Sequence, residues 1–227
     1  MLKKSNQYTV LNFNRTTQST QVDLYDFSSL QKTATLIDAK AHQGMSMIDS
    51  YSFDTDEKMM LLACNSTQIY RHSFTADYYL YDITNKELTK LFDFQIQEPT
   101  FSPDGKKIAF ARDNNLFVYD IATKSTSQIT TDGAKNSVIN GICDWVYEEE
   151  FAFVRAFDWS KDSKKVAFIR FDESNVPEFS MNVFAQQLYP LEQTFKYPKA
   201  GEKNSEVSLH IYDVNSKNSK TVDLSNY

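Results

Sequence analysis

The chain has 227 residues, enough for one large domain or two small ones, and a net charge of −6. That acidic balance argues against a nucleic-acid-binding surface. No apolar run approaches the roughly 20 residues of a membrane-spanning helix. The opening stretch MLKKSNQYTVLNFN carries two lysines but no apolar segment, so we expect no signal peptide in this chain.

Aromatic residues make up 14% of the chain, with 17 Phe and 13 Tyr. This composition predicts an all-β fold, because aromatic side chains pack well on pleated sheets. The cysteines, Cys64 and Cys143, are too few for a disulfide framework. We expect each to be a lone, partly buried thiol.

One phrase recurs along the chain: an aromatic residue, Ser, any residue, Asp, a polar turn and then alternating apolar residues. It begins at Tyr51 (YSFDTDEKMMLLA), Phe101 (FSPDGKKIAFA) and Trp159 (WSKDSKKVAFI). A second phrase, Tyr-Asp between apolar residues, follows the pattern at Tyr25, Tyr81, Tyr119 and Tyr212. Successive copies of the first phrase lie 50 and 58 residues apart, which indicates a repeated structural unit.

The copy that starts at Phe101 shows the unit most clearly. KKIAFA alternates, with Ile108 and Phe110 on one face, and Asp113–Asn115 is a turn signal. LFVYDI is the next strand, residues 122–124 turn again, and SQIT is a short last strand. The pattern predicts an antiparallel meander of about four strands. Such meanders, repeated every roughly 40–60 residues, are typical of β-propeller blades.

Residues 1–227 are therefore expected to form part of a propeller. The expected blades are 8–40 (incomplete), 47–95, 98–131 and 155–224, the last with a long excursion at about 172–205. Residues 132–154 fit no blade and are expected to form an insertion. Four blades either close into a rare four-bladed ring or are half of a larger ring. The larger ring is favoured, because the chain starts in mid-blade and stops just after a closing strand.

Most motifs that carry chemistry are missing from the sequence. The five glycines, at 44, 105, 133, 141 and 201, permit no G-x-S-x-G nucleophile elbow. The three histidines are far apart and form no H-E-x-x-H zinc motif. Neither a Gly-rich phosphate loop nor a pair of cysteine ligands is present. We expect no catalytic residue, no metal site and no cofactor in this chain.

Three adjacent carboxylates, Glu148, Glu149 and Glu150, interrupt the aromatic stretch GICDWVYEEEFAF. They are either a solvated charge run or a site for a cation. The cation site gains weight because like charges repel unless an opposite charge relieves them, and because two carboxylates can both accept charge-assisted hydrogen bonds from one ammonium. We expect a short helix or helical turn over residues 144–151. Sequence alone leaves open which two glutamates point inward.

Arg71 and His72 stand in the segment IYRHSFTADYYLYD. Arg71 is either a structural ion-pair partner or a donor to a carbonyl or carboxylate of a ligand. His72 is expected to be a packed or turn histidine. We expect Glu149 and Glu150 to lie near Arg71 if the segments share one site.

DWVYEEEF resembles the double-glutamate motif of the dipeptidyl peptidase IV family of serine exopeptidases. RHSFTADYYLYD resembles the segment that carries the substrate-contacting arginine of this family, and RFDESNVPEF and YPKAGEKN resemble its fourth-blade region. The resemblance implies an eight-bladed N-terminal propeller followed by an α/β-hydrolase domain, which this chain does not contain. It also implies release of N-terminal dipeptides, Xaa-Pro or Xaa-Ala, by a serine protease whose catalytic triad lies in that hydrolase domain.

The same resemblance implies a role for each candidate residue. Glu149 and Glu150 hold the α-ammonium of the substrate, and Arg71 contacts its backbone oxygen. Glu148, Tyr147 and His72 are possible supporting residues. These motifs resemble those of bacterial, Bacteroidetes-type members more than those of animal members. The resemblance implies a periplasmic or cell-envelope protein and a homodimer of the complete enzyme.

Two other functions stay open. The chain is alternatively a free-standing propeller that serves as a binding or interaction module without catalysis. It is also compatible with the propeller gate of a related oligopeptidase, which would not need the glutamate cluster. By itself the chain is not expected to hydrolyse peptides.

Overall fold

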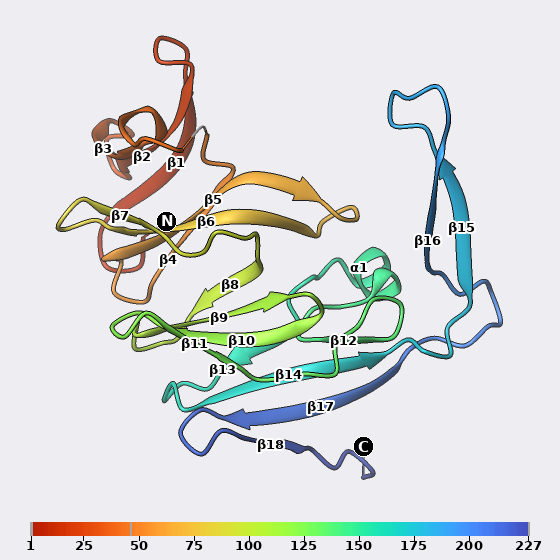
Figure 1. The fold of residues 1–227 in the computed structure, drawn as a ribbon. Coiled ribbons are helices and arrows are strands. Elements are labelled where there is room, and N and C mark those ends of the chain that lie inside the picture. Colours follow the sequence, from red (N-terminus) through yellow and green to blue (C-terminus); the bar gives the residue numbers. More distant parts are fainter. Residues whose placement is uncertain (1, 46, 227) are drawn as a thin grey trace.

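The computed structural model describes residues 2–45 and 47–226. They form antiparallel sheets joined by short turns, with a single-turn 3₁₀ helix η1 (Ala39–Ala41) and a short helix α1 (Trp145–Phe151) as the helices of this part of the chain (Figure 1). The all-β prediction is confirmed. None of these helices has the length and apolar character needed to span a membrane.

Four sheets follow one another along the chain. The first contains β1 (Gln7–Asn14), β2 (Ser19–Asp26) and β3 (Lys32–Asp38). The second contains β4 (Ser50–Phe53), β5 (Met59–Gln68), β6 (Phe74–Asp82) and β7 (Glu87–Lys90). The third contains β8 (Gln97–Phe101), β9 (Lys107–Arg112), β10 (Asn115–Asp120) and β11 (Ser125–Gln128). The second and third sheets have the strand order of simple meanders, as the repeat predicts.

The fourth sheet is more complex. Its main path runs through β12 (Val138–Asn140), β14 (Lys165–Asp172), β17 (Glu206–Asp213) and β18 (Asn218–Thr221), and β13 (Phe157–Trp159) also pairs with β14. The expectation that residues 132–154 lie wholly outside the blades is therefore wrong for β12. Val138, Ile139 and Asn140 pair with the end of β14 that β13 leaves free, because buried backbone groups there need partners.

The two repeated phrases have a physical basis in turn chemistry. In the Tyr-Asp phrase, the aspartate ends a strand and its side chain accepts backbone N–H bonds from the turn that follows. Asp82 accepts from Thr84 and Asn85, and Asp213 accepts from Asn215 and Ser216. In two copies of the Ser-x-Asp phrase the serine hydroxyl donates to the aspartate, Ser102 to Asp104 and Ser160 to Asp162. The repeated Ser and Asp residues therefore mark the turns between strands, and the alternating apolar residues between the turns fill the core.

Apolar side chains from neighbouring sheets form the core. Ile108 and Phe110, predicted to share a face, are 0% and 1% exposed and pack with residues of the second sheet. The two cysteines are free and buried, as expected, and burial raises the pKa of the Cys64 thiol to about 12.

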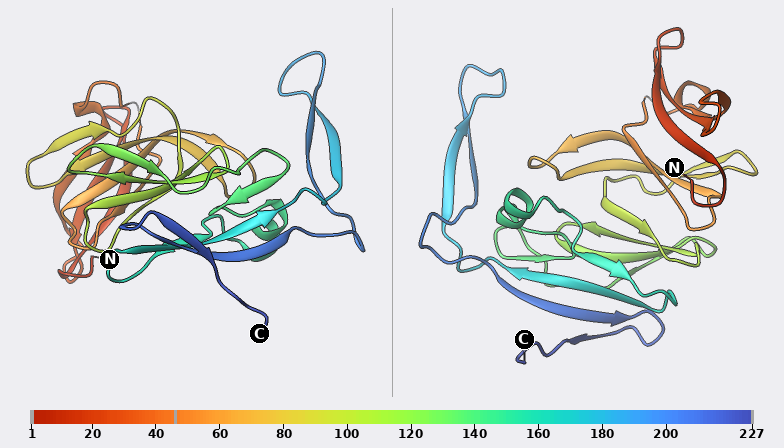
Figure 2. Two further views of the ribbon diagram at one scale, coloured as in Figure 1. Left: turned by 60° about the horizontal axis from the view of Figure 1, so that its bottom comes forward. Right: turned by 180° about the vertical axis from the view of Figure 1, so that it is seen from behind.

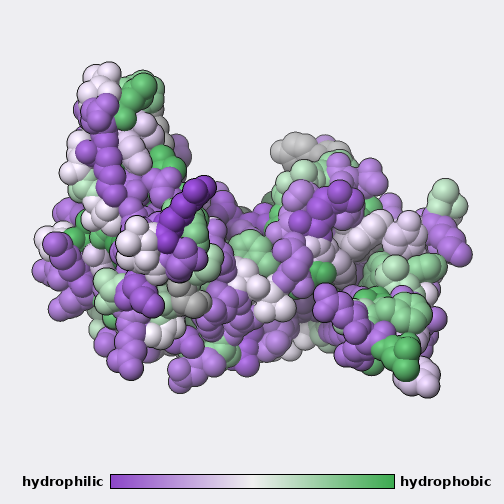
Figure 3. Space-filling model, turned by 90° about the horizontal axis from the view of Figure 1, so that it is seen from above, coloured by the Kyte–Doolittle hydropathy of each residue, from purple (hydrophilic) through white to green (hydrophobic). Residues whose placement is uncertain are grey.

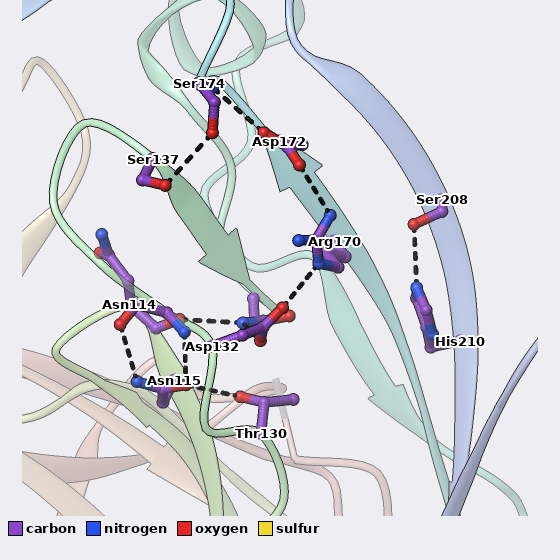
Figure 4. Close-up of polar contacts among 12 residues, drawn as sticks. Asn114, Asn115, Thr130, Asp132, Ser137, Arg170, Asp172, Ser174, Ser208 and His210 are labelled. Carbon is purple, nitrogen blue, oxygen red and sulfur yellow. Dashed lines mark hydrogen bonds and ion pairs between the residues drawn. The ribbon is translucent and has the colours of Figure 1, made fainter.

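The loop that leads into β12 is tied to β14 by polar contacts (Figure 4). Asp132 accepts from Nε of Arg170 at 2.8 Å and from Nδ2 of Asn140 at 2.9 Å. Arg170 also reaches Asp172 at 3.3 Å. These bonds fix the start of the segment that carries α1 against the fourth sheet.

The excursion expected at about 172–205 forms a two-stranded arm, β15 (Glu178–Val183) paired with β16 (Leu191–Lys196). Figures 1 and 2 show this arm projecting away from the four sheets. Its far end exposes large apolar side chains, and green surface marks it on the right of Figure 3. They are Phe184, Leu188, Tyr189 and Leu191, with Leu188 85% exposed.

Candidate substrate-binding site

Helix α1 forms because both of its ends are capped. The Asp144 side chain accepts a hydrogen bond from the N–H of Tyr147 at 3.0 Å, which satisfies one of the free donors of the first turn. The C-cap residue of the helix is Ala152, which has a left-handed φ of 54°. Its backbone N–H donates a hydrogen bond to the carbonyl of Glu148. The helical turn predicted over residues 144–151 is confirmed, with Asp144 as its cap.

Aromatic packing fixes the rotation of α1 about its axis. The Tyr147 ring meets Phe171 of β14 edge-on at 5.0 Å and is half-buried against the core. Successive helical residues diverge by about 100°. With Tyr147 facing the sheet, the three glutamates enter three environments: Glu148 is buried, Glu149 is intermediate and Glu150 is exposed.

Glu148 contacts the tip of the β5–β6 hairpin. Glu148 is only 1% exposed. Its Oε1 accepts the backbone N–H of His72 at 2.6 Å and the backbone N–H of Ser73 at 2.8 Å. Hydrogen bonds to a carboxylate are stronger than those to a neutral acceptor. This contact therefore joins α1 firmly to the second sheet, although 75 residues separate Glu148 from Ser73 in the sequence.

Glu149 pairs with the side chain of the same hairpin tip. The Nε of Arg71 lies 2.7 Å from Oε2 of Glu149. The arginine side chain is 68% exposed and that of the glutamate 17%. The two residues, which we expect from the sequence to lie near each other, are in direct contact.

The Arg71–Glu149 pair lines a pocket of about 720 Å³. Its walls come from the hairpin tip, from α1 and from the arm. They are Ile69, Tyr70, Arg71, Trp145, Glu149, Phe179, Met181, Gln193, Phe195, Tyr197 and Lys199. The rings of Trp145 and Tyr197 lie 4.5 Å apart, so the base of the arm packs directly on α1. The pocket is therefore lined by one acidic residue, Glu149, and two basic residues, Arg71 and Lys199, among aromatic side chains.

Acidic side chains also lie deeper, at the junction between α1 and the arm. Glu173 is 6% exposed, and its carboxylate has no hydrogen bond or ion pair with the described residues. Burial raises the pKa of Glu173 to about 7, with a smaller contribution from the nearby Asp144. Burial likewise raises the pKa of Asp144 and takes the pKa of Tyr70 to about 12. Burial in this region therefore opposes ionisation of both carboxyl groups and of the Tyr70 hydroxyl.

The other predicted residues, Glu150, His72 and Tyr147, do not line the pocket. Glu150 is exposed, does not line the pocket and has no ion pair or hydrogen bond with residues 2–45 or 47–226. His72 contributes its backbone N–H to Glu148, and Tyr147 belongs to the core. Within the same residues, no cluster of three or more His, Cys, Asp or Glu side chains could hold a metal ion.

Sequence reasoning did not assign the aromatic wall of the pocket. Phe179, Phe195 and Tyr197 come from the arm, about 50 residues away from α1 in the longest case. Nothing in their local pattern distinguishes a pocket residue from an ordinary strand residue. The segment YPKAGEKN, which contains Tyr197 and Lys199 and resembles part of the fourth-blade region of the family, is the signal in the sequence that points to this wall.

Comparison with known proteins gives a consistent result. Residues 54–227 match the family model described as "Dipeptidyl peptidase IV (DPP IV) N-terminal region". The chain is 39% identical over 186 residues to "Probable dipeptidyl-aminopeptidase B" of Talaromyces marneffei, covering 75% of this chain and 21% of that protein. It is 35% identical over 166 residues to "Prolyl endopeptidase FAP" of Mus musculus, covering 72% of this chain and 22% of that protein.

A solved structure extends the similarity to three dimensions. The crystal structure of Porphyromonas gingivalis dipeptidyl peptidase 4 superposes with a TM-score of 0.88 at 41% identity, covering 96% of this chain and 31% of that one. The chain spans about a fifth of the length of the curated relatives it matches. On the family match over residues 54–227, the chain belongs to the dipeptidyl peptidase IV family, as part of its N-terminal region.

Proposed function

We propose that this chain is the substrate-anchoring part of a serine dipeptidyl peptidase that releases Xaa-Pro or Xaa-Ala from free N-termini. In this proposal the four sheets are half of an eight-bladed propeller. The nucleophile, base and oxyanion hole that acyl transfer needs lie in an α/β-hydrolase domain outside these 227 residues. The propeller also restricts access to that site. Family resemblance to bacterial members supports a periplasmic or cell-envelope location.

The observation that carries the proposal is the contact between Arg71 and Glu149. Their atoms lie 2.7 Å apart although 78 residues separate them in sequence. Arg71 uses Nε for this bond, and its two terminal nitrogens form no hydrogen bond with the described residues. Those nitrogens are therefore available to a backbone carbonyl of a bound peptide. Glu149 has a second oxygen for an ammonium.

The proposed mechanism is electrostatic measurement of length. An α-amino group titrates near about pH 8, so most N-termini are charged at neutral pH. Glu149, which lines the pocket, binds that charge, and we propose the exposed carboxylate of Glu150 at the next position of α1 as its second partner. Arg71 holds the backbone oxygen that follows the ammonium. A peptide bound in this way can extend only a fixed distance towards the nucleophile. With two residues between the amine and the reacting carbonyl, dipeptides are released.

The arm supports the proposal of a homodimeric complete enzyme. Its far end exposes Phe184, Leu188, Tyr189 and Leu191, all four more than half exposed. An apolar patch on a projecting hairpin is typical of an interaction site. A second copy of the same chain is the partner we propose, because two identical arms can cover each other in a self-complementary contact.

The test uses the complete enzyme and a Gly-Pro chromogenic amide. Replacing Glu149 with Ala removes an ion-pair partner from a partly desolvated site, which typically costs about 2–5 kcal/mol, or roughly 30-fold to several thousand-fold in kcat/KM. The control is Glu87→Ala, at an exposed position on β7. An N-acetylated substrate should be a poor substrate for the unmodified enzyme.

Near-normal turnover by the Glu149→Ala, Glu150→Ala double variant would contradict the anchoring role. Equal cleavage of free and N-acetylated substrates would contradict it as well. If the complete gene encodes no hydrolase domain, the free-standing binding module becomes the better explanation.

A further inference from the structure

We propose that Glu148 is a positioning residue, and that its buried carboxylate holds the turn that presents Arg71 to Glu149 and to the substrate. The proposal rests on the anchoring function above, but it makes a separate structural claim. Glu148 binds the backbone just after Arg71, at His72 and Ser73, whereas Glu149 pairs with the Arg71 side chain.

The contact geometry supports this division. One oxygen of Glu148 accepts two successive backbone N–H groups, those of His72 and Ser73, at 2.6 and 2.8 Å. Ser73 is 4% exposed and Glu148 is 1% exposed, so water has little access to the Ser73 bond. Both donors follow Arg71 directly in the chain. Any rotation of the turn that moved Arg71 would break these bonds.

The rest of the turn does not replace them. Ile69 donates its N–H to the carbonyl of Ser73 at 2.9 Å, and Tyr70 donates to the Ser73 hydroxyl at 3.2 Å. These bonds close the base of the turn. The N–H groups of His72 and Ser73 have Glu148 as their hydrogen-bond partner among the described residues. Loss of Glu148 would leave the buried donor of Ser73 without a partner.

The Arg71–Glu149 pair is too exposed to hold the turn alone. Exposed ion pairs contribute little to stability, because solvent screens them and long side chains lose entropy. The Arg71 side chain is 68% exposed. The carboxylate-to-backbone bonds are shielded, and they restrain atoms with little freedom. Adjacent residues of one helix therefore have different tasks: Glu148 fixes the backbone, and Glu149 contacts the ligand-facing side chain.

The same observations argue against Glu148 as an amine ligand. Its residue is almost fully buried and does not line the pocket that contains Arg71 and Glu149. One of its oxygens already accepts two bonds. The role of Glu148 should therefore depend mainly on an oxygen acceptor placed within reach of the His72 and Ser73 N–H groups, and less on the negative charge of its side chain.

Three substitutions separate geometry from charge. Glu148→Gln keeps an oxygen at the same reach, Glu148→Asp keeps the charge but shortens the side chain, and Glu148→Ala removes both. In this chain, amide hydrogen exchange at His72 and Ser73 should accelerate about tenfold or more in the Ala and Asp variants, because the lost bond to a buried donor is worth at least 1–2 kcal/mol. The Gln variant should stay within a few-fold of the unmodified chain.

In the complete enzyme, the same variants should separate KM from kcat. We expect KM for a Gly-Pro amide to rise about tenfold in the Asp and Ala variants, with a smaller change in kcat and an unchanged rate of reaction with a small active-site label. Glu148→Gln should retain near-normal KM. If Glu148→Ala fails to fold, the Gln and Asp variants still decide the question.

Unchanged amide exchange and KM in the Asp variant would overturn the proposal. So would a Gln variant as damaged as the Asp variant in both measurements, since charge would then matter more than reach. If Glu149→Ala leaves turnover intact while Glu148→Asp frees the two amides, the anchoring function fails and the positioning contact stands.

Discussion

At the residue scale, three identical side chains in sequence have three different environments. Glu148 is buried, Glu149 is half-buried and paired, and Glu150 is exposed. The residues alone left two interpretations of the run open, a solvated charge run or a cation site, and the cation site gained weight because adjacent like charges repel without an opposite charge. The sequence could not predict which glutamate faces inward. The inward-facing glutamate depends on the rotation of α1 about its axis. The contact between Tyr147 on α1 and Phe171 on β14 of the fourth sheet sets this rotation.

Glu173 leads to a prediction about pH. Its folded-state pKa is raised to about 7 by burial, with Asp144 and Asp172 raising it further and Lys196 lowering it. Folding therefore favours the protonated acid, and the ionised form destabilises the fold. This penalty is absent below the ordinary pKa of a glutamate, grows as the pH rises from about 4.5 to about 7, and is complete above that range.

Glu173→Gln removes the ionisable group while keeping its size. We expect the variant to be more stable than the unmodified chain by about 1–2 kcal/mol at pH 8, after a discount for solvent screening, and nearly equal at pH 5. Urea unfolding at the two pH values measures this difference. Glu206→Gln, at an exposed position on β17, is the control. A gain that is the same at both pH values would show that ionisation is not the cause.

At the element scale, turns and alternation made the sheets predictable. The repeated Asp residues stop strands by accepting turn N–H groups, so their spacing gives blade positions directly. The three-residue strand β12 was missed because it is too short to show alternation. Its place is set by the free edge of β14, which is a tertiary feature. The walls that the arm contributes to the pocket escaped prediction for the same reason.

Helix α1 provides a prediction at this scale. Ala152 ends the helix with φ 54° and ψ 40°, a left-handed conformation that glycine adopts without a Cβ penalty. Ala152→Gly should therefore stabilise the chain by about 0.5–1 kcal/mol. Denaturant unfolding at neutral pH measures the change. Ala156→Gly, at a residue without positive φ and 7% exposed, should be destabilising instead. Destabilisation by Ala152→Gly would mean that the Ala152 methyl group makes packing contacts that outweigh the strain.

At the scale of the whole molecule, the chain combines a site with an arm. The tip of the β5–β6 hairpin, helix α1 and the arm belong to different parts of the sequence, yet all three line one pocket. The base of the arm packs on α1 through Trp145 and Tyr197, while its far end exposes Leu188 and Tyr189. Contacts at the far end can therefore influence the pocket through the hairpin that connects them.

The proposed dimer gives the prediction that belongs to this scale. Leu188 is 85% exposed and Leu191 is 61% exposed, so neither contributes to the core of its own chain. Replacing both with Asp should leave folding unchanged but place charges in an apolar contact between arms, where burial of an unpaired charge is costly. In the complete enzyme, sedimentation should then shift from dimer to monomer at micromolar concentration. Glu192→Lys, an exposed change on the same arm, tests whether any change of charge has this effect. A double Asp variant that remains dimeric would place the interface elsewhere, since two new carboxylates at the centre of an apolar contact should weaken it by several kcal/mol.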